Sequence, residues 1–461
     1  MSTRINIDWS RRLHEPFVYA ALLIALGAGF TFGALLGIAR ALGLPIGGWY
    51  SALVQAHGHA QLFGWVGLFV LGVGLYFLPR LRGTTLQGIS RAPLAWSLLV
   101  AGIVLRCIVQ PLAGFFGASE ISSALFMLSA LLETAAILVI FSMLWQTTRT
   151  AKPILPDTPV YSIERFAQIA FVSIALAFLL NLLGVWNLVS QAKSVVAPRY
   201  DQPIVTLFLY GAALPMIFVF SLRTLPLFLR LPVPTRNIWR TFALIYFLGL
   251  VLRILPFLLA IVDDALMLTE RAVRANFIIL LLFDALAVVG TIILNTCILF
   301  FIARLNFFQR RQLAEASHGA RANYADRGEY GRFELLIYSA FVWLIVAALL
   351  DLLRVLPILN ERIFVPQDAV RHALMLGGIT LLIFGMAVRM LPGFSGKRAV
   401  AFPRLVLWMF VLGNLAVLFR VLPTFFGQTD WTAGLLGLSG IVGWFAVLLL
   451  AINMWKTFHL K

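Results

Sequence analysis

The sequence predicts an all-α polytopic membrane protein with twelve transmembrane helices. Of its 461 residues, 61% are hydrophobic and only 12% are charged, about half the charged fraction that is usual for a soluble domain. Apolar stretches of roughly 20 residues recur from one end of the chain to the other, and each is long enough to cross the hydrocarbon core of a bilayer. The loops between these stretches alternate between rich and poor in Lys and Arg.

The loop charges fix the expected orientation. Cytoplasmic loops of membrane proteins collect Lys and Arg, so the alternation predicts that both termini are cytoplasmic. The same rule accounts for the formal net charge of +17, and we expect no nucleic-acid partner. No stretch is polar enough for a separate soluble domain, so residues 1–461 are expected to form one membrane domain, with a basic loop at 305–332 on the inner side. The predicted spans are 17–39, 51–79, 92–112, 122–145, 166–190, 203–226, 239–261, 275–303, 334–357, 369–392, 402–423 and 431–455.

An internal repeat relates the second span to the tenth. The segment "HAQLFGWVGLFVLGVGLYFLPR" from His59 aligns without gaps with "HALMLGGITLLIFGMAVRMLPG" from His372. The histidines, two glycines and a Leu-Pro pair coincide, and the next spans end in "VLRCIVQPLAGFFG" and "LFRVLPTFFG". Because a repeat at a fixed period reflects repeated architecture, spans 2 and 10 are expected to occupy equivalent places.

Spans 6 and 7 form a third and weaker copy. Leu225-Pro226 aligns with Leu78-Pro79, and "VLRILP" around Arg253 matches the motif around Arg106. The position equivalent to His59 is Thr206 in this copy, so its histidine is missing. One copy every four helices predicts three arcs related by a pseudo-threefold axis.

The two aligned histidines are the main candidates for a functional site. His59 and His372 each lie twenty residues before a proline at the inner boundary, a distance of roughly 30 Å along a helix. Both should therefore lie at similar depth near the outer side. Haem iron takes histidine as an axial ligand, and facing helices of a bundle supply cofactor ligands. The pair predicts a haem b site, although two helix-end histidines bonded to backbone carbonyls would give the same pattern.

A third histidine, His57, stands two residues before His59. Residues at this spacing point about 200° apart on a helix, so the two cannot both face one iron. The sequence leaves three roles open for His57: a second metal such as copper, a hydrogen bond to a haem propionate, or exposure at the outer interface.

Four arginines lie near the outer ends of odd-numbered spans. Arg106 and Arg420 directly follow the two histidine-bearing helices. Guanidinium groups recognise carboxylates and stay charged when buried, so these two are the predicted partners of the haem propionates. Arg253 and Arg354 show the same placement without a neighbouring histidine, and extension of the side chains to the outer interface explains all four equally well.

Two acids, Glu133 in span 4 and Asp284 in span 8, are predicted to lie at similar depth in the membrane. Ionisable residues inside a membrane often mark proton or ion paths, and a neutral hydrogen-bonded role is the alternative. Asp351 and Arg354 are three residues apart and are expected to pair on one helix face.

The layout of twelve spans in three arcs, with histidines on spans 2 and 10, resembles subunit I of the haem-copper oxidases. The segments "HGHAQLFGWVGLFVLGVGLYFLPRLRG" and "RHALMLGGITLLIFGMAVRMLPGFSGK" are more specifically similar to the NnrS family. This resemblance implies a haem-containing protein of the bacterial inner membrane, with or without copper, linked to nitric oxide metabolism or resistance. It also implies membrane lipid and a respiratory-chain electron donor as partners.

The chain departs from the oxidases in its ligands. Spans 6 and 7 hold no histidine, and span 10 holds only His372. By position, His59 and His372 match the low-spin haem ligands, and the binuclear oxygen-reducing centre is expected to be lacking. The early NnrS motif usually reads "HE", whereas this chain reads "HGH".

Two other classes of function fit the composition. A twelve-helix secondary transporter would use Glu133, Asp284 and Asn181 along its path. An assembly factor for a respiratory complex would carry no stoichiometric haem. A colourless, metal-free protein that binds a solute would favour the transporter.

Overall fold

The computed structural model describes residues 9–154, 159–232, 234, 238–266, 273–307, 328–356, 364–427 and 429–460. Within these ranges the chain is built from helices and short connections, and twelve helices are long and apolar enough to cross a membrane. The prediction of an all-α protein with twelve spans is confirmed. Most of the predicted basic loop at 305–332 lies outside the described residues.

The spans are longer than the apolar stretches that predict them, since helices continue past the hydrocarbon boundary. The first six spans are α2 (His14–Ile24) with η1 (Ala25–Phe30) and α3 (Thr31–Ala41), α4 (Gly48–His59) with η2 (Ala60–Gly67) and α5 (Leu68–Leu81), α6 (Ala92–Phe116), α7 (Glu120–Thr150), α8 (Pro159–Ser190), and α9 (Pro198–Thr206) with η4 (Leu207–Ala213) and α10 (Leu214–Leu229). The other six are α11 (Trp239–Leu266), α12 (Val273–Arg304), α13 (Phe333–Val355), α15 (Gln367–His372) with η6 (Ala373–Thr380) and α16 (Leu381–Phe394), α17 (Leu405–Val421), and α18 (Asp430–Phe458). Short helices form α1 (Trp9–Arg12), η3 (Ile89–Arg91) and η7 (Leu422–Phe425).

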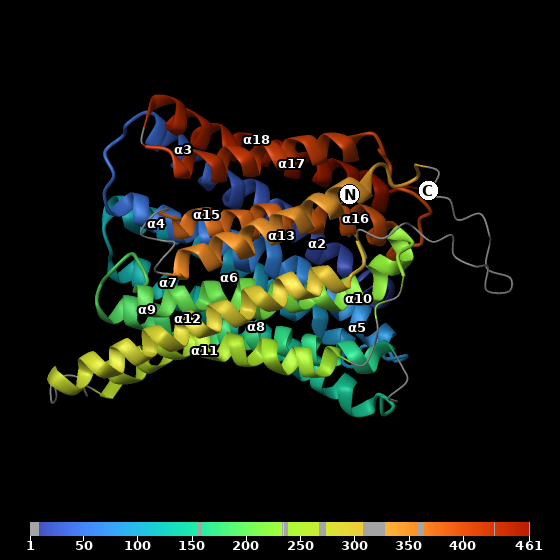
Figure 1. The fold of residues 1–461 in the computed structure, drawn as a ribbon, viewed down its shortest axis with the longest axis horizontal. Coiled ribbons are helices and arrows are strands. Elements are labelled where there is room, and N and C mark those ends of the chain that lie inside the picture. The colour runs from blue at the N-terminus through green and yellow to red at the C-terminus, as the bar shows by residue number, and fades with distance from the viewer. Residues whose placement is uncertain are drawn as a thin grey trace, which may run out of the picture.

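Spans that follow one another in the sequence pack against one another, and the last span packs against the first. Figure 1 shows this closure, with α3 and α18 side by side along one edge of the bundle. Spans 2, 6 and 10 are the most enclosed: 78%, 89% and 83% of their most apolar windows are buried, against 61% or less in the other spans. The three equivalent helices of the repeat therefore form the centre of the bundle.

The three central helices share a local irregularity. Each contains a π-helical segment, and each segment begins one residue after the aligned position: after His59 in η2, after Thr206 in η4 and after His372 in η6. Such segments occur most often at functional sites. Trp65 of η2 donates a hydrogen bond to the hydroxyl of Thr380 in η6 at 3.1 Å, which joins two of them directly.

The aligned glycines let each central helix approach the span before it. A Cβ at Gly64 would lie 2.4 Å from Cγ2 of Ile24, and one at Gly377 would lie 2.6 Å from Trp343. The equivalent Gly211 of the third copy lies against Ser173, where a Cβ would be 2.5 Å from the hydroxyl. The close approach thus recurs between spans 1 and 2, 5 and 6, and 9 and 10, which supports the third copy.

Both ends of the described chain lie at the same end of the bundle (Figure 1). His14, at the start of the first span, contacts Phe394 and Phe458 at ring-centroid distances of 5.5 and 6.0 Å. The aligned histidines lie towards the opposite end, because His59 and His372 come early in spans that start there.

Candidate functional site

A cavity of about 440 Å³ lies in the half of the bundle away from the termini. Its walls come from eight spans, and it brings together all five residues singled out in the sequence: His57, His59, His372, Arg106 and Arg420. His59 of span 2 and His372 of span 10 thus line one cavity, and their role there stays a prediction. The cavity has four arginines and two aspartates in its walls, so its charged lining is predominantly cationic.

His59 is held by a carboxylate and an aromatic ring. Its Nε2 donates to Oε1 of Glu133 at 2.8 Å, and its ring stacks on Phe63 at a centroid distance of 4.1 Å. Glu133 is completely buried, and its other oxygen accepts a hydrogen bond from Asn181 at 2.9 Å. The sequence placed Glu133 inside the membrane but gave no sign that it reaches span 2.

His57 faces the first span instead of the outer interface. Its Nδ1 donates to the backbone carbonyl of Gly29 at 2.7 Å, and its ring lies so close to Gly33 that a Cβ there would be 2.9 Å from Cε1. Gly29 belongs to the π-helical segment η1. Two carbonyl groups of η1 thus accept hydrogen bonds from side chains on other spans: Gly29 from His57, and Leu26 from Trp444 at 3.1 Å.

His372 lies at the end of α15 and bonds within its own turn. Its Nδ1 lies 2.9 Å from the carbonyl oxygen of Asp368 and 3.0 Å from the Oδ1 carboxylate oxygen of the same residue. Asp368 also accepts a hydrogen bond from Arg420 at 2.8 Å. The predicted propionate partner Arg420 is thus partly engaged by an acid, although its Nε is buried without a partner in the described part of the chain.

Arg106 is almost completely buried, at 3% exposure. Its Nε donates to Gln110 at 2.9 Å, Gln110 continues the chain of contacts to Gln55 at 2.9 Å, and the guanidinium lies 4.8 Å from the ring centre of Phe126. Its Nη1 is buried and has no partner among the described residues. An unpaired buried donor is costly, so Arg106 offers a site for an acceptor.

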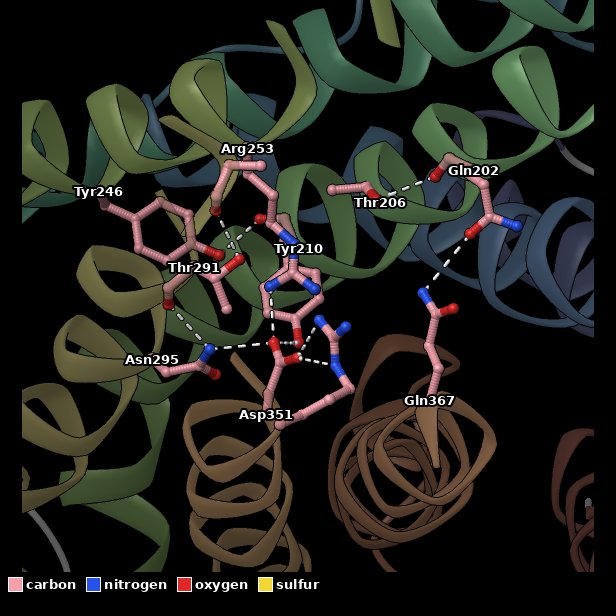
Figure 2. A network of polar contacts seen from close by, with 11 residues as sticks. Gln202, Thr206, Tyr210, Tyr246, Arg253, Thr291, Asn295, Asp351 and Gln367 are labelled. Atoms are coloured by element: carbon pink, nitrogen blue, oxygen red, sulfur yellow. Dashed lines mark hydrogen bonds and ion pairs between the residues drawn. The ribbon is translucent and has the colours of Figure 1, made fainter. Parts of the chain in front are cut away.

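In the third copy, the equivalent region is filled by an ion cluster. Asp351 is buried and accepts hydrogen bonds from spans 6, 7, 8 and 9, and Figure 2 shows Tyr210, Arg253 and Asn295 around it. Arg253 donates to Asp351 at 2.7 Å, Tyr210 at 2.9 Å and Asn295 at 3.0 Å. Arg354 binds the other oxygen through two nitrogens, at 2.9 and 3.1 Å. The predicted pairing of Asp351 with Arg354 is confirmed, and Arg253 and Arg354 serve this cluster.

Thr206, which replaces the histidine in this copy, donates its hydroxyl to the carbonyl of Gln202 on its own helix at 2.9 Å (Figure 2). Glu133 and Asp284 differ in burial: Glu133 is buried, whereas Asp284 is exposed on α12, eleven residues after that helix begins at Val273. That the two acids lie at similar depth in the membrane stays a prediction. The buried polar residues of the third copy include Asn295 and Asp351.

Besides Arg40 in the first span, three charged residues of the cavity were not predicted from the sequence: Asp201, Asp368 and Arg371. All three lie at the starts of spans 6 and 10, where loop residues and cavity residues look alike in sequence. Arg371 donates to Gln202 on span 6. Arg371 directly precedes His372, and Asp368 lies four residues before it, a spacing that puts Asp368 on the same helix face as His372. These positions are the sequence signal for both residues.

Within the described ranges, no three His, Cys, Asp or Glu side chains are grouped closely enough to hold a metal ion by themselves. The cavity therefore provides no polydentate protein site of the kind that binds structural zinc.

Together, the spans and the cavity define a multi-pass membrane protein with a cationic, histidine-bearing cavity among its central helices. The chain belongs to the NnrS protein family, whose profile matches residues 14–459 and so covers nearly all of it. No curated protein matches it in sequence.

Proposed function

We propose that the cavity holds haem b between His59 and His372, and that the protein takes part in electron transfer or nitric oxide handling in the bacterial inner membrane. One observation carries the proposal: the two histidines related by the internal repeat line the same cavity, at the ends of helices that meet at the centre of the bundle. Two helix-end histidines that served only to bond backbone carbonyls would have no reason to line a shared cavity.

The residues present fit a porphyrin. Each histidine uses one ring nitrogen in a hydrogen bond and keeps the other for a ligand. The cavity wall includes the apolar side chains of Leu62, Phe63 and Leu376, and Arg106 and Arg420 each keep a buried donor without a partner in the described ranges. An apolar macrocycle with two carboxylates matches this combination of apolar surface and free guanidinium donors.

A haem held by these two histidines would supply one-electron transfer. The protein's own contribution is to fix the two imidazoles, to exclude water with buried aromatic side chains, and to neutralise the propionates. The nitric oxide link and the inner-membrane location follow from the family resemblance, and a respiratory-chain donor is the expected source of electrons. His57 remains the candidate for a second metal such as copper.

The test is a reduced-minus-oxidised absorbance spectrum of the purified protein, with the haem-to-protein ratio. We expect a haem b spectrum that is lost in both His59→Ala and His372→Ala. His459→Ala is the matched control, because that exposed histidine bonds only to Trp455 of its own helix. Full haem content in both cavity variants would reject the ligand assignment. A colourless protein that binds a solute would instead favour the transporter.

A further inference from the structure

Glu133 is fully buried, and its carboxylate accepts a hydrogen bond from the cavity histidine His59. No other fully buried acid among the described residues contacts a histidine of the cavity. Glu133 lies on span 4, one helix behind the cavity wall, and is not among the residues that line the cavity. Glu133 can therefore affect a ligand bound in the cavity only through another side chain.

The local packing is built to bring Glu133 to His59. Gly102 of span 3 lies directly against it, and a Cβ there would be 2.6 Å from Cγ of Glu133. Ser129, one turn earlier on α7, donates to the carbonyl of Gly102 at 3.0 Å and so ties the two helices together. A larger residue at position 102 would clash with Glu133, so the glycine permits this close approach.

The carboxylate of Glu133 accepts one hydrogen bond on each oxygen, from His59 at 2.8 Å and from Asn181 at 2.9 Å. The Ser129 hydroxyl also lies 3.4 Å from Oε1, but it donates its one proton to the Gly102 carbonyl. An acceptor at Nε2 fixes His59 in the tautomer that carries its proton there. Nδ1 is then the unprotonated ring nitrogen, and it has no partner among the described residues.

The two histidines of the repeat therefore present different nitrogens. His372 bonds through Nδ1 to Asp368 and keeps Nε2, whereas His59 bonds through Nε2 and keeps Nδ1. Only His59 has a fully buried carboxylate behind it. Carboxylate partners of this kind orient ligating histidines and increase their donor strength.

We propose that Glu133 is a positioning residue that makes Nδ1 of His59 the ligating atom and tunes the bound metal centre through the imidazole. This inference rests on the proposed haem function for its redox consequence, but not for the tautomer. A negative charge behind the ligand stabilises the oxidised iron, so its removal raises the reduction potential. Loss of an outer partner typically weakens metal affinity by roughly 10- to 100-fold.

The first measurement uses protein labelled with ¹⁵N-histidine and freed of haem, with the His59 signal assigned through its absence in His59→Ala. The wild type should show the proton on Nε2, Glu133→Gln should keep it there, and Glu133→Leu should lose the fixed tautomer. A proton on Nδ1 in the wild type would overturn the proposal whether or not the protein binds haem.

The second measurement is a redox titration of the haem-loaded protein. Glu133→Gln should raise the midpoint potential, and Glu133→Leu should lower haem affinity by about 10- to 100-fold. Thr134→Val is the control, because that neighbouring hydroxyl bonds only to its own helix, at Ala130. Potentials that coincide in Glu133→Gln and wild type would overturn the tuning role. A protein with the Nε2 tautomer but no haem would overturn the proposed function and leave the positioning of His59 intact.

Discussion

The ion cluster of the third copy gives a sharp test of the fold. Asp351→Asn keeps the size of the side chain and removes its charge. Asp351 has no exposed surface, and the Arg253 side chain is only 11% exposed, so this pair is largely removed from water. Breaking a buried ion pair by changing one partner costs about 3–5 kcal/mol. Arg354 is 27% exposed, and its share adds at most about 1 kcal/mol.

We therefore expect Asp351→Asn to destabilise the protein by at least about 3 kcal/mol and at most about 6 kcal/mol, which is more than a hundredfold in the folding equilibrium. The assay is reversible unfolding in mixed micelles or, where unfolding is irreversible, the thermal midpoint at a fixed scan rate. Asp430→Asn is the matched control, because Asp430 is exposed at the start of α18, and surface changes of this kind stay within about 0.5 kcal/mol.

A double-mutant cycle with Arg253→Gln separates the pair from general disruption. The combined variant should lose less than the sum of the single losses, by at least about 1 kcal/mol. Equal stability of Asp351→Asn and Asp430→Asn, or additivity within about 0.5 kcal/mol, would refute the argument that the cluster is a coupled buried network.

The remaining predictions concern packing, the cavity and orientation. Gly64→Ala should destabilise by about 1–3 kcal/mol through its clash with Ile24, whereas Gly27→Ala, with open space around it, should not, as thermal midpoints in detergent would reveal. Arg106→Gln should lower the haem-to-protein ratio of the purified protein, and equal ratios in Arg106→Gln and wild type would remove that arginine from the propionate site. His57→Ala should keep the haem b spectrum; its loss would give His57 a ligand role. A reporter fused to the C-terminus should register the cytoplasmic side, and a periplasmic signal would reverse the topology.

The sequence predicts the large features well because they depend on hydropathy and on the repeat. Span lengths follow from the thickness of the bilayer, and the alignment of His59 with His372 places both on central helices. Both histidines also line one cavity, as expected where equivalent residues of a repeat occupy equivalent places around its axis.

The contacts between helices could not be predicted in the same way. In a span that is apolar all round, the hydropathy pattern does not reveal which face meets which neighbour. The pairing of Glu133 with His59 depends on that rotation, and so does the exposure of Asp284. The π-helical segments add a further rotation within spans 2, 6 and 10, and they have no sequence signature of their own.

The most direct test of the account is an experimental structure of the protein purified with its pigment in the oxidised state. We predict one iron in the cavity of the central helices, with Nδ1 of His59 and a ring nitrogen of His372 as its two protein ligands. An iron bound elsewhere, or a cavity filled by an unrelated solute with both imidazoles unligated, would contradict it.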